Sequence, residues 1–525
     1  MKKFLIITVM FAAILNINSC SESDLNLLPQ TQDVISSTID NENDLQAFLN
    51  GAYLSISNVD VYGGMALVNG DLISDIAFQT NLSNSPFTFS ANLNYTAFNN
   101  DFTSYRGLYN TIVRCNTVIN NEQFPNSNNV REMQGQAKIL RAFAYMALLD
   151  QYSPSPSSGV NQEYGVPLHL ENYNATLQLP RATVAEVYAQ IILDLQGGLS
   201  DAPDIGAGGL TIKKVILTKT AAKLLLSRVY LTRRAPGDAA LALQYASEIV
   251  NDGNPPPNNP PPDFAPIVID DLPPPPGFAG ATAEEKYRYY FSSNNNNETT
   301  PTVPPVAPRQ PAAEGHQETI WELDMNASNL QPTNIGSNGS LPDWYLRTGT
   351  RKSLMFNKSF YDSFANTDVR KGAGTTGLLT SAGQGNVDSP PGYWTNKYPK
   401  LTLDGNYFRN IKILRFAEAQ LNRIEALYLT GDENTALIEL NTFAASRRGS
   451  TYTGTDLLND ILTERAKEFY GEGQRFRDLK RYGLPLNKPS NCTTCNLPAN
   501  DLRFVFPIDQ EALTANQNLT QYPGY

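Results

Sequence analysis

Two parts of the chain repeat one helix-hairpin pattern, and this repeat limits the possible folds more than any other feature. Apolar spacing predicts a helix pair at 217–234 and 238–251, and a second pair at 411–430 and 433–447. Both pairs turn at a Gly-Asp step, at Gly237 and at Gly431. Because neither hairpin buries its own apolar face, the two are expected to stack, as tetratricopeptide units do. The predicted fold is mainly α: a tetratricopeptide-like helical repeat scaffold, with an irregular loop-rich subdomain containing short strands.

Residues at matching positions of the two hairpins support the repeat. Counted from the turn glycines, the matching apolar pairs are Ala242 with Ala436, Leu243 with Leu437, Ala246 with Leu440, and Ile249 with Phe443. Small residues in the first helix of each pair, at Ala221 and Ala417 among others, permit a close approach of the helices. Further helices are predicted at 43–57, 101–120, 130–151 and 183–199, the last with a capping box formed by Thr183 and Glu186.

The segment between the two hairpins has a different composition. Residues 253–317 form a Pro- and Asn-rich insertion, which is predicted to be flexible because such a sequence does not form a packed core. Order is expected to return at Glu318, since Glu318–Leu323 alternates like a strand. The region 318–410 is rich in Gly, Asn and Ser, which predicts a loop-rich subdomain with short strands.

A highly charged stretch, Glu464–Gly483, follows the second hairpin. Its charged residues fall three and four apart, and Gly471 and Gly473 interrupt it. This pattern predicts two helices with a tight joint, held by ion pairs rather than prepared for catalysis. The residues assigned this structural role are Glu464, Arg465, Glu472, Arg475, Asp478 and Arg481.

The N-terminal residues 1–19 have the features of a lipoprotein signal peptide. Two lysines precede a short apolar run, and Ser19 supplies the small residue before Cys20. Cys20 is the predicted lipidation site, and residues 20–39 are the predicted lipid-anchored tether. Each buried CH₂ contributes about 0.8 kcal/mol, so several acyl chains hold a protein on a membrane. The alternative is an ordinary secreted protein with a chance cysteine.

Aromatic residues in the loop-rich region are the ligand-binding candidates. Flat rings stack on sugar faces or pack against peptide side chains, and binding residues gather on loops. The candidates are Trp344, Tyr345, Tyr393 and Trp394, with Arg347 and Asn396 as hydrogen-bonding neighbours, and Tyr62 in the N-terminal region. The alternative is that these rings pack in the core or within the subdomain.

No sequence pattern of a catalytic or metal site stands out. The chain has no H-E-x-x-H, G-x-S-x-G or P-loop motif, and the G-x-G-x-x-G match at Gly372–Gly377 does not follow a buried strand. Cys492 and Cys495 are a possible disulfide, with free thiols or half of a metal site as alternatives. A net charge of −11 disfavours nucleic acid as a partner. We therefore expect no enzyme activity, no cofactor and no metal.

The charged stretch also carries a family resemblance. Glu464-Arg465, Glu468, Gly471–Leu479 and Arg481–Gly483 resemble the C-terminal signature of the SusD/RagB family. Gly165-Val166-Pro167-Leu168, the strand-like Glu318–Leu323 and the final Tyr522–Tyr525 follow the order of that family's other motifs. The chain departs from the family after Tyr152, where a longer turn is inserted, and in the Pro-rich insertion.

The resemblance implies a surface lipoprotein of Bacteroidetes that is anchored by lipid at the extracellular face of the outer membrane. Such a protein binds an oligosaccharide or peptide nutrient and caps a SusC-like TonB-dependent channel for import. It implies an N-terminal helical region at 40–252 and a C-terminal helical region with the signature at 411–525. Two alternatives stay open. One is a scaffold subunit of another outer-membrane assembly with little ligand binding. The other is a surface glycoside hydrolase, for which acid pairs such as Asp71 and Asp75 would be needed.

Overall fold

The structure, a computed structural model, describes most of the chain after the N-terminal segment. The described residues are 39–81, 85–125, 127–204, 214–252, 265–272, 280–292, 316–325, 340–347, 349, 351–372, 378–381, 390–398, 410–488 and 491–525. The chain divides into two compact units, Met1–Gln46 and Ala47–Tyr525. Cys20, the predicted signal peptide and all but the end of the predicted tether lie outside the described residues. No helix among the described residues is long and apolar enough to cross a membrane.

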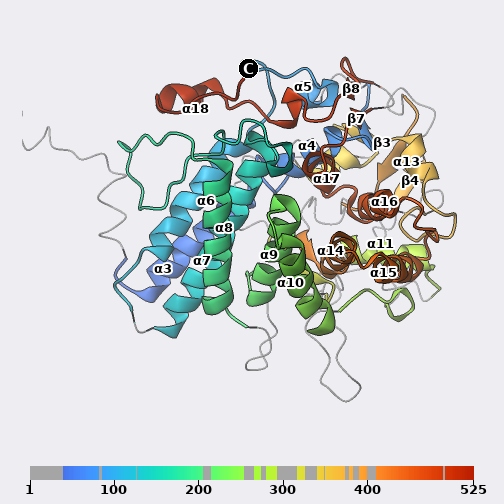
Figure 1. Ribbon diagram of the computed structural model, residues 1–525, viewed down its shortest axis with the longest axis horizontal. Helices are drawn as coiled ribbons and strands as arrows, with labels where there is room; N and C mark the ends of the chain where they lie inside the picture. Colours follow the sequence, from blue (N-terminus) through green and yellow to red (C-terminus); the bar gives the residue numbers. More distant parts are fainter. Residues whose placement is uncertain are drawn as a thin grey trace, which may run out of the picture. The chain divides into compact units, whose positions relative to one another are not determined.

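Most of the described chain is helical (Figure 1). The longer helices are α3 (Glu42–Ile56), α4 (Met65–Leu72), α6 (Ser104–Ile119), α7 (Asn128–Tyr152), α8 (Val184–Asp201), α9 (Lys219–Arg233), α10 (Asp238–Asp252), α11 (Ala283–Ser292), α14 (Phe416–Leu429), α15 (Glu433–Ser446), α16 (Leu457–Phe469) and α17 (Gln474–Arg481). The predicted capping box is present at the start of α8, where the Thr183 hydroxyl accepts from the Glu186 N–H and the Glu186 carboxylate accepts from the Thr183 N–H. Successive helices pack on one another from α6 to α10, and α10 then packs against α14.

The two predicted hairpins are α9–α10 and α14–α15, and they stack through α10 and α14. The mainly helical, tetratricopeptide-like scaffold is thus confirmed. One boundary was predicted wrongly: the expected helix at 411–430 begins as the strand β6 (Ile411–Arg415). All five residues of β6 are buried. A short run that is buried on both faces has no polar side, so periodicity does not separate it from a helix.

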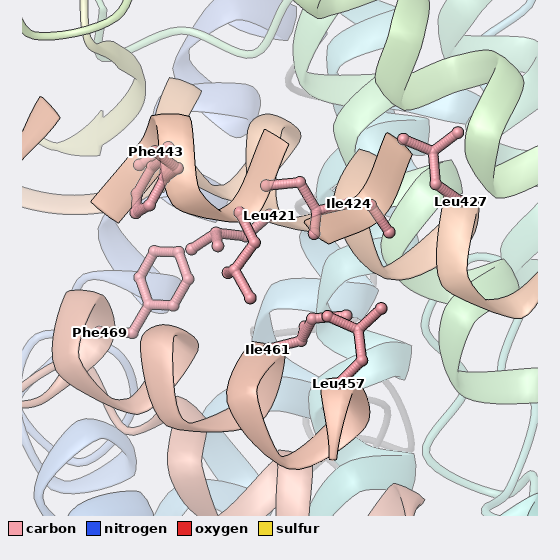
Figure 2. Packing of buried hydrophobic residues seen from close by; sticks show 10 residues of the cluster. Leu421, Ile424, Leu427, Phe443, Leu457, Ile461 and Phe469 are labelled. Carbon is pink, nitrogen blue, oxygen red and sulfur yellow. The ribbon is translucent and has the colours of Figure 1, made fainter. Parts of the chain in front are cut away.

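The C-terminal hairpin shares one apolar core with α16 (Figure 2). Figure 2 shows side chains from α14, α15 and α16 pointing toward one another. The fully buried members of this cluster include Leu421, Leu440 and Ile461, and the small Ala417 and Ala436 lie among them. Burial of each Leu or Ile side chain contributes about 1.5–3 kcal/mol, so this cluster explains why the second hairpin is a fixed part of the scaffold.

The strands form three small antiparallel sheets. A four-stranded sheet has the order β1-β3-β5-β4, a second pairs β2 with β6, and a third pairs β7 with β8. The strands are β1 (Ala77–Gln79), β2 (Thr319–Leu323), β3 (Leu354–Phe356), β4 (Leu379–Ser381), β5 (Tyr393–Thr395), β7 (Leu486–Asn487) and β8 (Asn496–Leu497). The strand predicted at 318–323 is β2. The four-stranded sheet joins the loop-rich region to the N-terminal region, because β1 pairs with β3.

Short helical segments complete the described structure. They are α5 (Thr88–Asn92), α12 (Leu341–Tyr345), α13 (Lys358–Asp362), α18 (Gln510–Ala515), and the 3-10 segments η1 (Pro156–Ser158), η2 (Ile269–Asp271) and η4 (Leu502–Phe504). Part of the insertion predicted as flexible is also helical. Within 253–317, α11 buries Tyr287 and Tyr290 completely or almost completely, at 0% and 2% exposed. Those rings and Phe291 share one face of the helix, and this face forms core despite the surrounding prolines. The rest of the insertion lies largely outside the described residues.

The charged stretch folds as two helices, α16 and α17, as predicted. Gly473 precedes α17 with φ at +68°, a conformation that favours glycine. A Cβ on Gly70 of α4 would lie 2.3 Å from the Gly473 carbonyl oxygen, so the small residues let α4 approach this joint. The six signature side chains all form ion pairs: Glu464 with Arg370, Arg465 with Asp478, Glu472 with Lys397 and Arg415, Arg475 with Asp75, and Arg481 with Glu425 and Asp478.

Candidate ligand-binding site

Four of the predicted ligand-binding rings lie in the interior. Trp344 is 2% exposed, Tyr345 and Trp394 are fully buried, and Tyr62 is 7% exposed. Trp344 packs edge-on against Phe87 at 5.0 Å between ring centroids. A ring with no exposed face does not stack on a ligand, so these positions support the packing alternative. Trp394 is buried in the β1-β3-β5-β4 sheet, where it shares a cluster with Phe78 and Met355, whereas Tyr62 packs against Phe143 of α7 at 4.6 Å between ring centroids.

The other three predicted candidates lie nearer the surface. Tyr393 is half-buried and stacks on Tyr361, with ring centroids 3.6 Å apart and planes 3° apart. Arg347 is exposed, and Asn396 is half-buried with its backbone N–H bonded to the Leu378 carbonyl at 2.8 Å. Tyr393, Arg347 and Asn396 therefore stay predictions. Their position at the surface makes contact with a ligand possible, but it is not evidence of binding.

A different ring is the most exposed large apolar side chain among the described residues. Phe98 is 81% exposed. It lies in the loop Asn94–Asp101, here called the Phe98 loop, between α5 and α6. Sequence reasoning missed it, because Tyr95 and Phe102 flank it at helical spacing and the three rings look equivalent in the sequence. The structure buries those two, at 3% and 4% exposed, and leaves Phe98 in solvent.

The Phe98 loop is held rigidly by the aromatic residues at its two ends. Tyr95 packs edge-on against Phe102 at 4.7 Å, and Phe102 stacks on Phe506 at 3.8 Å. The Tyr95 hydroxyl donates to the carbonyl of Arg503. Within the loop, the Thr96 N–H donates to the Asn99 carbonyl at 2.9 Å. The ring of Phe98 is therefore presented by a fixed backbone rather than by a loose loop.

The C-terminal end of the loop is tied to α5, and α5 is in turn tied to the C-terminal segment. The Asp101 carboxylate accepts hydrogen bonds from the backbone N–H groups of Phe89 and Ser90 at 3.0 and 3.1 Å. Burial raises the pKa of Asp101 to about 6, although these hydrogen bonds oppose the rise. Cys492 and Cys495 form a disulfide, as predicted, and the residues between them bond to Asn92 at the end of α5, with Thr493 N–H to Asn92 Oδ1 at 3.1 Å.

The exposed ring on the ordered Phe98 loop suits stacking against a flat apolar surface. A phenyl ring loses unfavourable contact with water when a sugar face covers it, at roughly 25 cal/mol per Å² of apolar surface. Asn94 and Asn99, both exposed, lie on either side of Phe98 in the chain and carry amide groups that suit hydroxyl partners. Because the backbone is already ordered, little conformational entropy is lost on binding.

The acid pair considered for glycosidase chemistry is engaged in structural contacts. Asp71 accepts hydrogen bonds from the Tyr345 hydroxyl at 2.6 Å and from the Gly473 N–H at 3.3 Å. Asp75 forms an ion pair with Arg475 at 2.7 Å. Neither carboxylate is free to act on a substrate in this arrangement. Across the described ranges, no three His, Cys, Asp or Glu side chains gather in a way that would hold a metal ion.

Two family models match the chain, one after the other. The model described as "Starch-binding associating with outer membrane" matches residues 25–231, and the model described as "SusD family" matches residues 283–525. The curated "Starch-binding protein SusD" of Bacteroides thetaiotaomicron is 34% identical over 127 residues, which are 22% of each chain. The chain thus matches about a fifth of the length of that relative.

Solved structures share the fold over almost the whole chain. A SusD superfamily protein of Bacteroides thetaiotaomicron superposes with a TM-score of 0.72 at 22% identity, covering 92% of this chain and 99% of its own. A putative sugar binding protein of Bacteroides vulgatus gives 0.68 at 24% identity, covering 92% and 98%. The "Surface glycan-binding protein A" of Bacteroides uniformis gives 0.64 at 20% identity, covering 92% and 99%. At these identities the likeness establishes the fold.

Proposed function

The chain belongs to the SusD/RagB family, and on this premise we propose that it binds a glycan at the cell surface and works with a SusC-like TonB-dependent channel of the outer membrane. In this proposal Cys20 carries the lipid anchor, and the protein caps the channel over the captured glycan. The family description as starch-binding and outer-membrane-associated supports both the ligand class and the location. The names of the similar proteins, one starch-binding and one glycan-binding, point to the same class.

The observation that carries the proposal is the exposure of Phe98, at 81%, on an ordered loop. An apolar ring held in solvent has no role in the stability of the scaffold, whereas it adds contact area for a ligand. A glycan suits the site better than a peptide, because the exposed Asn94 and Asn99 of the same loop carry amide groups that suit the hydroxyls of a sugar. The proposed role is binding only, with transport by the channel and no bond made or broken by this chain.

A direct test combines a ligand screen with a partner screen. The full-length protein would be run on native gels containing amylopectin, xylan, mannan or β-glucan, and titrated with casein peptides as a separate arm. Retardation by at least one polysaccharide is expected. Retardation by none of them, with binding of peptide, would contradict the glycan proposal.

The partner screen separates import from a scaffold role. The tagged protein would be purified in mild detergent from the cells that produce it. A TonB-dependent channel as the main partner is expected. Recovery of several unrelated outer-membrane proteins without such a channel would favour the scaffold alternative instead.

A further inference from the structure

A pocket separate from the Phe98 loop opens between α6, the segment 167–177 and α18. Its volume is ≈ 430 Å³, which lies within the range of about 300–1,000 Å³ that small-molecule sites occupy. No residue of the Phe98 loop lines it. The packing contacts of the scaffold described above do not fill this pocket. Its lining residues therefore indicate the chemistry of a ligand that would bind there.

Two tyrosines pack together along one side of this pocket, where the half-buried Tyr109 rests on Tyr105, which is 7% exposed. Tyr105 and Tyr109, one turn apart on α6, have ring centroids 4.9 Å apart. Tyr109 meets the His169 ring edge-on at 5.6 Å, and its hydroxyl donates to the Pro167 carbonyl at 3.0 Å. These contacts fix the orientation of the rings before a ligand arrives. Tyr173, 48% exposed, adds a third ring from the opposite segment.

The polar groups of the pocket suit hydroxyl groups. Burial lowers the pKa of His169, which keeps its imidazole neutral near pH 7 with one donor and one acceptor. The exposed side chains of Asn110 and Asn172 also line the pocket, and neither makes a hydrogen bond to another described residue. Amides and a neutral imidazole both donate and accept, as the hydroxyls of a sugar require.

The charge around the pocket disfavours an anionic ligand. Glu171, Asp509 and Glu511 line it, whereas Arg106 is the cationic residue in its lining. Arg106 already lies 3.8 Å from Glu511 in an exposed ion pair. A uronic acid or a sulfated sugar would meet a net negative rim, so a neutral sugar fits the site better.

We infer that this pocket binds the end of a neutral glycan, over one or two sugar units, as a site separate from Phe98. The inference rests on the proposed function, which supplies the ligand class. The rings of Tyr109 and Tyr173 supply apolar contact, with the buried Tyr105 supporting Tyr109, and Asn110, Asn172 and His169 supply hydrogen bonds. A concave pocket suits a chain end, while an exposed ring such as Phe98 accepts the middle of a chain. The two sites together would retain a long glycan more firmly than either alone.

The test fills the pocket while leaving Tyr105 and Tyr109 unchanged. Ala515 lies on α18 and lines the pocket, while Thr514 beside it is exposed and does not. Ala515→Trp fills the cavity, and Thr514→Trp is the matched control. Probes are maltose and maltoheptaose, with the corresponding disaccharides and oligosaccharides of xylan, mannan and cellulose, measured by isothermal titration. Thermal unfolding of each variant verifies the fold, and Tyr173→Ala provides a second variant that removes contact rather than space.

The expected result is a loss of affinity of about tenfold or more in Ala515→Trp and in Tyr173→Ala, with Thr514→Trp like the wild type. Disaccharide binding should also be unchanged in Leu193→Ala, because Leu193 is an exposed apolar residue of α8 that does not line the pocket. If the wild type binds a glycan and both pocket variants bind it equally well, the pocket inference is wrong and the proposed function stands. If the wild type binds none of the glycans, the proposed function and this inference both fail.

Discussion

The hydroxyl of Tyr345 donates a 2.6 Å hydrogen bond to the carboxylate of Asp71, a residue 274 positions earlier in the chain. Asp71 also accepts from the Gly473 N–H, so one buried carboxylate joins α4, α12 and the joint before α17. Burial raises the pKa of Asp71 to about 7, although both hydrogen bonds oppose the rise. The same contact places Tyr345 in the interior, where it supports the scaffold.

Asp71→Asn is predicted to change how stability depends on pH. The folded protein keeps the Asp71 proton up to about pH 7, whereas an unfolded Asp loses it near pH 4. The group therefore lowers the unfolding free energy progressively as pH rises from about 4 to 7, by roughly 1.4 kcal/mol per unit of pKa difference at most. Urea unfolding across that window should show the variant gaining on the wild type as pH rises. Parallel curves for the two proteins would show that Asp71 is not protonated in the folded state.

Glu468→Gln is predicted to destabilise the protein strongly. Burial alone would raise the pKa of Glu468, but Arg447, Arg415 and Arg370 hold it well below its ordinary value. Removing the charge leaves three buried guanidinium groups with reduced compensation, which costs about 3–5 kcal/mol in comparable sites. Chemical denaturation gives the magnitude. Asp362→Asn, which breaks the exposed pair with Lys358, is the matched control and should change little.

Trp394→Ala is predicted to act on stability. Trp394 is fully buried against Phe78 and Met355, so its removal leaves a cavity and costs about 3–5 kcal/mol. Thermal unfolding should show a clear decrease in Tm. A variant with wild-type Tm and weakened glycan binding would instead restore Trp394 as a ligand contact.

The helical scaffold could be predicted from the sequence because its signals are local. The capping box at Thr183, the Gly-Asp turns and the joint at Gly473 each depend on residues within one or two turns of chain. Burial in the four-stranded sheet could not be predicted from the sequence, since β1 and β3 are three residues long and pair across a large part of the chain. For the same reason Trp344 and Trp394 looked like loop residues.

The candidate site was harder to predict than the scaffold. Tyr95, Phe98 and Phe102 have similar neighbours in the sequence, and only the packing of Phe506, some four hundred residues later, separates the buried rings from the exposed one. The pocket has the same origin, because α6 and α18 are distant in the chain. In contrast, ion pairing within the charged stretch could be predicted from the sequence, since Arg481 and Asp478 lie one helical turn apart.

Cys20→Ala is predicted to release the protein from the membrane. Acyl chains on the Cys20 thiol would provide the anchor, and no helix of the described residues is able to replace them. Fractionation of cells producing the variant should recover it in the soluble fraction. Ser19→Ala, which keeps a small residue before the cysteine, is the control and should remain with the membrane. Retention of Cys20→Ala in the membrane fraction would refute lipid anchoring.

The most direct measurement is the affinity of Phe98→Ala for the glycan that retards the wild-type protein. Leu193→Ala is the matched control, because Leu193 is also an exposed large apolar residue, at 62%, but lies on α8. We predict a loss of about tenfold or more in affinity for Phe98→Ala, with an unchanged Tm, and wild-type affinity for Leu193→Ala. Equal affinity of Phe98→Ala and the wild type would contradict the assignment of the Phe98 loop as the glycan-binding site.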